Sequence, residues 1–452
     1  MAYQTVNPYT GKLVQTFAEH SDTDLQNVVA RAQAGYTEWR SRSVADRCAV
    51  LGRAAALLRL RSRELAALLT LEMGKLTRGA LGEVSLSADI LEYYANNAEA
   101  FLAPRTLSVS DGEASIVTDS IGVILCIEPW NFPYYQLARV VGPNLAVGNT
   151  LIAKHAPNVP QSALAFEQVM FDAGAFPGVY TNVFISNEQA AAVIADDRVR
   201  GVALTGSERA GSAVAAEAGK ALKKSTMELG GSDAFIVLDD ADLDFAAKTG
   251  AASRLENGGQ VCNAAKRFIV QERVADAFIE RFVSRMSAVR PGDPAHETTT
   301  LQPLNSESAL RLALGQVNVA VNAGATLLLG GKRTGMQGFF MEPTVLTDID
   351  RENPVFHQEF FAPVAMVFRV RDDAEAVALA NDSPFGLGAT IMSGDTARAR
   401  NMAMKIESGM VFINRGETSA PHLPFGGVKN SGFGRELADL GLNEFVNKKL
   451  IY

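Results

Sequence analysis

The stretch that decides the fold class covers residues 199–231 and reads VRGVALTGSERAGSAVAAEAGKALKKSTMELGG. It holds a short apolar run, VALT, then a helical pattern over 208–224 and a second β-prone run, KKSTMEL. The same alternation precedes it, because LIAK and VFIS are strand-like while 161–172 and 188–195 have helical spacing. Strands that alternate with helices in this way predict a parallel sheet with helices on both faces.

Outward from this stretch, a second alternating region extends over 234–411 and contains the strand-like runs AFIVL, RFIVQ, TLLLGG and VAMVFRV. We therefore predict two α/β domains, each built on a parallel sheet. The first hundred residues have helical patterns, and Ser21 with Asp24 resembles a capping box. At 115–127 the runs SIVTDS and IGVILCI predict a hairpin or two sheet strands.

Composition excludes several classes of protein. The chain has 452 residues and a formal net charge of −8, so no nucleic-acid partner is expected. Three cysteines cannot form a disulfide framework, and the five histidines lack ligand spacing, so we expect no metal site. No apolar run is long enough to span a membrane, and the N-terminal residues do not resemble a signal peptide. These features predict a cytoplasmic protein with no membrane partner.

Cys262, in ENGGQVCNAAKR, is the first candidate for chemistry. A cysteine in a polar, glycine-rich loop can be partly exposed, and a helix N-terminus or a nearby cation such as Lys266 would lower its pKa. The alternative is an inert core residue. Cys48, within a helical pattern, and Cys126, in an apolar strand, fit that alternative.

Three further candidates for chemistry lie near the ends of predicted strands. Glu228 in TMELGGSD follows a strand, where open α/β sheets bind ligands, although a surface or capping glutamate is the ordinary alternative. Asn131 in EPWNFPYYQLAR is a candidate oxyanion donor or a plain turn residue. Gly206 and Ser207 begin a helix whose N–H groups could hold a phosphate, although the chain has no GxGxxG fingerprint at this point.

Together these pieces resemble the aldehyde dehydrogenase superfamily over nearly the whole chain. The matching strings have the family's order and spacing. They are EMGK at 72–75, PWNFP at 129–133, TGS at 205–207, MELGG at 227–231, GQVC at 259–262, QEFFAP at 358–363, NDSPFGL at 381–387 and PFGGVKNSGFGRE at 424–436.

This resemblance implies a reaction and its residues. Cys262 would attack the aldehyde, Asn131 and the cysteine N–H would hold the oxyanion, and Glu228 would activate the water that hydrolyses the thioester. Asn414 would order the surroundings of the cysteine. The implied cofactor is NAD or NADP, bound by Trp130, Lys154 (adenosine ribose), Pro157, Gly206, Ser207 (pyrophosphate), Glu359 (nicotinamide ribose) and Phe361 (beside the ring).

Two departures from the family pattern bear on the cofactor and on regulation. Many members follow the lysine with Pro-Ser-Glu, whereas this chain has His155-Ala156-Pro157 after Lys154. Losing the glutamate removes repulsion against a 2′-phosphate, yet Pro157 adds no donor, so we expect both cofactors to bind, with a slight preference for NAD. Ala264 is not a cysteine, so the disulfide switch of some relatives is not expected.

Within the superfamily the chain most resembles the short bacterial succinate-semialdehyde dehydrogenases. Arg139 matches an arginine that binds the substrate carboxylate there, although an ion pair between elements is the alternative. Glu256 would oppose a carboxylate, and Ser419 belongs to the segment 415–422 that is expected to line the pocket mouth. Uncharged aliphatic aldehydes or amino-aldehydes are therefore the alternative substrates.

Two other functions remain to be weighed. Transfer of the acyl group to coenzyme A is less consistent with Glu228, which supports hydrolysis. A catalytically silent homologue used as a binding protein is disfavoured because Cys262, Asn131, Glu228 and Glu359 are all present.

The resemblance also implies three structural parts. We expect a cofactor-binding domain at 1–112 and 128–228, a catalytic domain at 229–424, and a small β oligomerisation flap at 113–127 and 437–452. An open flap edge invites pairing with a second copy, so we expect a homodimer, with a tetramer as the alternative.

Overall fold

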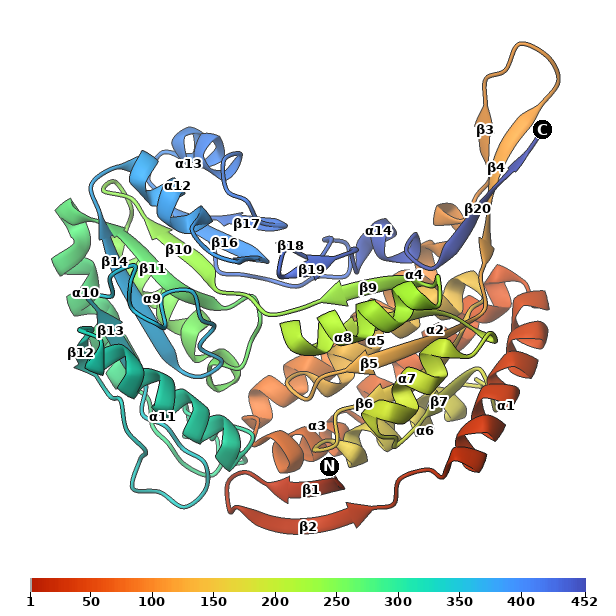
Figure 1. Cartoon of the computed structure of the whole chain (residues 1–452), viewed down its shortest axis with the longest axis horizontal. Helices are drawn as coiled ribbons and strands as arrows, with labels where there is room; N and C mark the ends of the chain where they lie inside the picture. Colours follow the sequence, from red (N-terminus) through yellow and green to blue (C-terminus); the bar gives the residue numbers. More distant parts are fainter. Residues whose placement is uncertain (1) are drawn as a thin grey trace.

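Two mostly parallel β-sheets form the body of the protein in the computed structural model, which describes residues 2–452 (Figure 1). Helices cover both faces of each sheet, so the predicted α/β class with two parallel sheets is confirmed. The helices are α1 (Asp22–Ser41), α2 (Val44–Leu60), α3 (Ser62–Met73), α4 (Thr77–Phe101), α5 (Pro133–Val147), α6 (Pro160–Asp172), α7 (Asn187–Ala195), α8 (Glu208–Lys220), α9 (Leu243–Leu255), η1 (Glu256–Gly259), α10 (Glu272–Ser287), α11 (Glu307–Asn322), α12 (Asp373–Asn381), α13 (Thr396–Ala403) and α14 (Ala438–Leu442).

The first sheet has six strands, and its two faces are covered by different helices. Alternate side chains of a strand point to opposite faces, so Val123 and Leu125 join the core beneath α1 and α7, while Ile124 and Cys126 join the core with α2, α4 and α5. In spatial order the strands are β19 (Gly432–Phe433), β9 (Lys224–Glu228), β8 (Val199–Thr205), β5 (Val123–Glu128), β6 (Thr150–His155) and β7 (Tyr180–Asn182).

The second sheet has seven strands and is built in the same way. Phe235 and Phe268 face one core, whereas Ile236 and Ile269 face the other. The strand order is β12 (Thr326–Leu329), β13 (Thr344–Thr347), β14 (Val364–Val370), β11 (Ala265–Gln271), β10 (Asp233–Val237), β16 (Gly388–Met392) and β17 (Met410–Ile413).

A three-stranded antiparallel flap projects from the body and carries the C-terminus (Figure 1). Its strands are β20 (Val446–Ile451), β4 (Ala114–Ser120) and β3 (Arg105–Leu107). The expectation that the flap includes residues 121–127 is wrong, because β5 lies inside the six-stranded sheet. The residues of β5 from Val123 to Cys126 are all buried, as an interior parallel strand requires.

The N-terminal region differs partly from its predicted form. The chain begins with a hairpin, β1 (Tyr3–Asn7) and β2 (Lys12–Phe17), before the helices α1 to α4. The predicted capping box is confirmed, since Ser21 and Asp24 bond each other's backbone N–H at the start of α1. A further short pair joins β15 (Phe385–Gly386) to β18 (Val428–Lys429).

Two local expectations also change. The strand expected at VFIS is β7, which ends just before it at Asn182, and the helix expected to reach Lys224 ends at Lys220. No helix within residues 2–452 has the length and apolarity that a membrane crossing requires.

Candidate active site

Cys262 lies in the loop that joins α9 to β11, directly after η1. Its backbone is tightly constrained, since Asn257, Gly258 and Gly259 have φ angles of 48°, 65° and 78°. A Cβ added at Gly259 would lie 2.3 Å from the Ala362 carbonyl, so only glycine fits there. The loop therefore presents the half-buried cysteine in one fixed geometry.

Burial dominates the ionisation of Cys262. It raises the pKa of the thiol to about 12, although the positive charges of Arg139 and Lys266 act in the opposite direction. The lowered pKa expected from the sequence is therefore not found in this state. The physical reason is burial, which outweighs the two cations, and Cys262 precedes a strand, so no helix N-terminus adds to their effect.

Asn131 is held beside the cysteine loop, between β5 and α5. Its side-chain Nδ2 donates to the Gln260 carbonyl at 3.0 Å. Its own carbonyl accepts from Lys75 Nζ at 3.0 Å and from Asn257 Nδ2 at 2.9 Å. These bonds fix the Asn131 amide relative to the loop that carries Cys262.

Glu228 ends β9 and is buried, and neither of its carboxylate oxygens has a hydrogen-bond partner. Burial raises its pKa well above the ordinary value, and the negative charge of Glu436 adds to the rise while Arg139 opposes it. A buried, unpartnered carboxyl with a raised pKa suits a group that accepts and releases a proton.

A cleft of about 260 Å³ approaches Cys262 from one side. Trp130 and Phe361 meet edge to face across it, with ring centroids 5.6 Å apart. Ser207 begins α8 and caps it by accepting from the Ala210 N–H at 3.3 Å. The lining residues are Pro129, Trp130, Asn131, Gln136, Thr205, Gly206, Ser207, Leu229, Gly230, Cys262, Glu359 and Phe361.

A second cavity, of about 320 Å³, is also lined by Cys262. Tyr135 and Ser419 are joined there by a hydrogen bond from the phenol to Ser419 Oγ at 2.9 Å. Two acidic side chains, Glu256 and Glu417, also line this cavity. Cys262 is thus the residue at which the two cavities meet, together with Gln136.

Comparison with known proteins identifies the family of this chain. The model of the aldehyde dehydrogenase family matches residues 1–451. The chain belongs to the aldehyde dehydrogenase family. A protein of Deinococcus radiodurans named succinate-semialdehyde dehydrogenase [NADP(+)] is 51% identical to it. The match covers 99% of this chain and 94% of the relative.

Two further relatives extend the comparison. A Synechocystis protein named probable succinate-semialdehyde dehydrogenase [NADP(+)] is 43% identical, with both chains covered completely. A crystal structure of succinic semialdehyde dehydrogenase from Streptococcus pyogenes, in complex with NADP+, matches with a TM-score of 0.98 and 48% identity. That match covers 100% of this chain and 99% of the other.

Arg139 of this aldehyde dehydrogenase lies behind the second cavity rather than among its lining residues. It is fully buried, and its Nε forms an ion pair with Glu436 at 2.5 Å. Its Nη1 donates to the Tyr135 hydroxyl at 3.3 Å, and Tyr135 in turn donates to Ser419. Arg139 thus contacts the lining of this cavity through Tyr135 and through Phe425, whose ring centroid is 4.4 Å from the guanidinium carbon.

Several other predicted residues lie away from Cys262. Lys154, whose pKa is lowered by burial, and Pro157 lie at the end of β6 and beyond it, outside the lining of either cavity. Asn414 does not order the cysteine, because both its side-chain bonds go to the backbone of Ser393, at 2.9 and 2.8 Å. No group of three or more potential metal ligands occurs within residues 2–452.

Sequence reasoning missed the buried residues that support the site. Lys75, Tyr135 and Glu436 belong to the quoted strings EMGK, EPWNFPYYQLAR and PFGGVKNSGFGRE, but their roles depend on contacts that no motif specifies. Lys75 pairs with Glu83 and holds Asn131, while Tyr135, Glu417 and Glu436 lie at or behind the second cavity. Lys266 was expected only as a cation near the thiol, and its bonds to the Val261 and Cys262 carbonyls were not predicted.

Proposed function

We propose that this aldehyde dehydrogenase oxidises succinate semialdehyde to succinate, with NADP as its principal cofactor and Cys262 as its nucleophile. The position of Cys262 in the lining of both cavities carries the proposal, because an aldehyde in one cavity and a cofactor in the other could both reach the sulfur. The names of full-length relatives at 43% to 51% identity support the choice of substrate and cofactor.

The chemistry begins when Cys262 loses its proton and Sγ attacks the aldehyde carbon. The oxygen becomes an anion, which Asn131 Nδ2 and the Cys262 N–H would stabilise. A nicotinamide cofactor held in the first cleft would accept the hydride that leaves the adduct carbon, and the cysteine would then carry a thioester. Glu228 takes a proton from the water that attacks this thioester, which releases the acid and regenerates the thiol.

The first cleft suits a nicotinamide dinucleotide. Glu359 offers a carboxylate to ribose hydroxyls, Trp130 and Phe361 offer apolar surface, and Ser207 begins the helix that would face a phosphate. The slight preference for NAD from the sequence gives way to NADP because the relatives are named for NADP(+). The absence of a carboxylate in the three residues after Lys154 is compatible with that cofactor.

The substrate carboxylate would bind through hydroxyl groups. Tyr135 and Ser419 face the second cavity, and the buried Arg139 polarises them from behind through its bond to the phenol. We propose that Arg139 stabilises the carboxylate by this route instead of by a direct bidentate contact.

Glu256 and Glu417 favour a second candidate, an aldehyde that carries an ammonium group. Both line the second cavity, and burial raises the pKa of Glu417 to about 8. An approaching cation would favour the ionised form of Glu417 and so bind it more tightly.

Three aldehydes of similar length separate these candidates: succinate semialdehyde, pentanal and 4-aminobutanal, each assayed with NADP and with NAD. We expect kcat/KM for succinate semialdehyde to exceed that for pentanal at least about tenfold, or about 1.4 kcal/mol of transition-state binding. Ser419→Ala should reduce that ratio. A preference for 4-aminobutanal would establish the second candidate, and equal values would reject both.

We further propose that the six-stranded sheet binds the cofactor, that the seven-stranded sheet carries the nucleophile, and that two copies pair through the flap. β20 is an edge strand, and its Leu450 and Ile451 are exposed. Sedimentation should give a homodimer, or a tetramer built from two such pairs, and Leu450→Lys should weaken it. A cytoplasmic location fits the three free cysteines.

A further inference from the structure

Lys266 is a fully buried lysine four residues after the candidate nucleophile. Its Nζ donates to the carbonyl of Val261 at 2.8 Å and to that of Cys262 at 2.6 Å. It also forms an ion pair with Glu359 Oε1 at 3.2 Å. Two of the three donor hydrogens of the ammonium group are thus used by backbone carbonyls, and the contact with Glu359 is an ion pair.

Glu359 is fixed on its other side by the turn after β9. The Gly231 N–H donates to the same Oε1 atom at 3.2 Å. A Cβ added at Gly230 would lie 2.5 Å from Oε2, so the carboxylate packs directly against the backbone there. Glu359 also lines the first cleft, so its carboxylate is shared between the cleft and Lys266.

Lys266 contacts two groups that have different expected roles. One is a carboxylate in the cleft proposed for the cofactor, and the other is the backbone carbonyl of Cys262 itself. The same peptide segment supplies the Cys262 N–H that would face the oxyanion. Within residues 2–452, Lys266 is the one side chain that joins Glu359 to that segment, by an ion pair at one end and by two hydrogen bonds at the other.

Packing alone does not explain a charged group at this position. Lys266 lies near the start of the interior strand β11, where an apolar side chain of similar length would fill the same volume without losing hydration of a charge. A buried ammonium is retained at a cost in desolvation, and its three contacts all lie at the junction of the cleft and the cysteine loop.

We infer that Lys266 is a positioning residue that couples the cofactor cleft, through Glu359, to the geometry and ionisation of Cys262. A bound ribose would donate hydrogen bonds to the Glu359 carboxylate. Glu359 would then neutralise a different share of the Lys266 charge, and this would change the electrostatic potential at Cys262. This inference rests on the proposed function for the identity of the cofactor, but the contacts themselves do not depend on the aldehyde.

Four charged groups act on the Cys262 thiol. Arg139 and Lys266 favour the thiolate, whereas Glu359 and Asp233 disfavour it. Removing the charge of Lys266 leaves Glu359 uncompensated near the sulfur, so the thiolate should become rarer. Removing the charge of Glu359 as well should restore much of the loss, because the two groups act on the sulfur in opposite directions.

The test is the rate of Cys262 alkylation by iodoacetamide in the full-length protein, measured from pH 6 to pH 10 with and without NADP. We expect Lys266→Met to react about tenfold more slowly than the wild type at pH 8, which corresponds to a rise of about one unit in the thiol pKa. Lys266→Arg should stay closer to the wild type. The double variant Lys266→Met/Glu359→Gln should recover at least about threefold over Lys266→Met.

NADP provides the second readout. It should change the alkylation rate of the wild type, and the change should be lost in Lys266→Met and in Glu359→Gln. Lys332→Met and Glu342→Gln form the matched control, since this lysine–glutamate pair is at the surface, with Lys332 72% exposed and the charged atoms 3.8 Å apart. Neither control should alter alkylation.

Two results would overturn the inference: an unchanged thiol pH profile in Lys266→Met, or a double variant that recovers none of the rate lost in Lys266→Met. If Lys266→Met does not fold, Glu359→Gln decides, since it should accelerate alkylation and abolish the NADP response. The choice of aldehyde does not enter these measurements. A failure of the succinate-semialdehyde assignment would therefore leave the alkylation results intact, and a failure here would leave that assignment intact.

Discussion

The two sheets of this aldehyde dehydrogenase present opposite edges to the site. In the six-stranded sheet, the cleft lies at the carboxyl ends of the strands: β5 leads into Asn131, β8 into Ser207 and β9 into Gly230. In the seven-stranded sheet the site lies at the amino ends, since Cys262 precedes β11 and Glu359 precedes β14.

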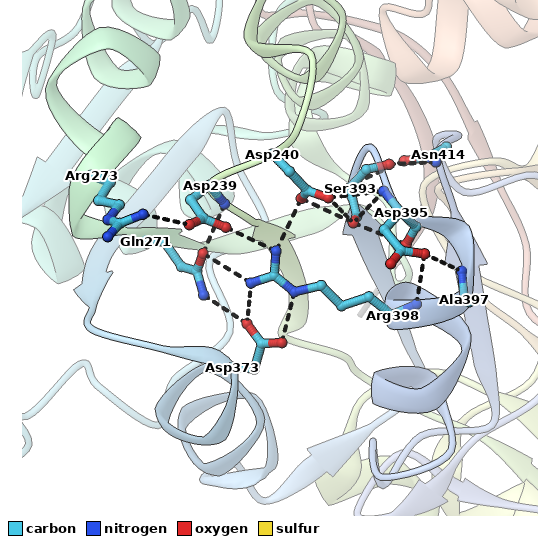
Figure 2. A network of polar contacts seen from close by, with 10 residues as sticks. All are labelled: Asp239, Asp240, Gln271, Arg273, Asp373, Ser393, Asp395, Ala397, Arg398 and Asn414. Carbon is cyan, nitrogen blue, oxygen red and sulfur yellow. Dashed lines mark hydrogen bonds and ion pairs between the residues drawn. The ribbon is translucent and has the colours of Figure 1, made fainter.

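The carboxyl edge of the seven-stranded sheet is closed by a polar cluster (Figure 2). Arg398 of α13 forms ion pairs with Asp239 at 2.8 Å and with Asp373 at 2.5 Å. Ser393 donates to Asp240 at 3.0 Å and is bonded through its backbone to Asn414. An arginine thus occupies the edge at which an open α/β sheet ordinarily binds its ligand.

This difference shows that strand direction alone does not locate a site. The rule that ligands bind at carboxyl ends holds for one sheet, and in the other that edge serves stability. The proposed reactive centre lies where a carboxyl edge and an amino edge meet. Each of the following predictions tests one edge against the other.

Loss of the nucleophile at the amino edge should have the largest effect. Cys262→Ala should reduce aldehyde oxidation at least about a thousandfold, since no other group can form the thioester. Steady-state assays at saturating substrate measure it. Cys48→Ala, which alters a buried thiol in α2, should retain activity within about twofold, and comparable losses in the two variants would contradict the assignment.

A substitution of Glu228 tests the role of the carboxyl edge of the six-stranded sheet. Glu228→Gln should slow turnover about a hundredfold, because water then lacks its base. Rapid mixing should reveal one equivalent of NADPH per active site followed by a slow phase, since hydride transfer precedes hydrolysis. Turnover without such a burst would mean that Glu228 acts before the thioester forms.

The pH dependence of Cys262 alkylation tests how the buried position of the thiol, before a strand, affects its ionisation. With a thiol pKa of about 12, the thiolate is the minor form and its fraction rises about tenfold per pH unit. Alkylation of the cofactor-free wild type should therefore accelerate about a hundredfold between pH 7 and pH 9. A plateau near pH 8 would show that the cations outweigh burial.

Arg398 should give the smallest effect, and on stability rather than activity. Arg398→Met should lower the free energy of unfolding by about 1–2 kcal/mol, a value discounted because solvent reaches 28% of the side chain. Urea titration at low and high salt measures it. Arg273→Met, whose side chain is 84% exposed, is the control and should cost no more than about 0.5 kcal/mol. A large loss of kcat in Arg398→Met would assign function to this edge.

The sequence predicted the parallel sheets well because short apolar strands and amphipathic helices follow each other at regular intervals. It misassigned residues 121–127, since an apolar run near a β-prone one looks like a hairpin whether or not the two strands share a sheet. It placed Asn414 near the cysteine by resemblance, yet the side chain is used in the cluster at the far edge.

The sequence by itself determined the fold class, the family resemblance and the reactive residue types at Cys262, Asn131 and Glu228, because these depend on local pattern and on motifs. Only the tertiary structure decided that Arg139 lies behind Tyr135 and that Lys266 joins Glu359 to the cysteine loop. Such contacts bring together residues far apart in the chain, and their burial sets both protonation and access, so no local pattern encodes them.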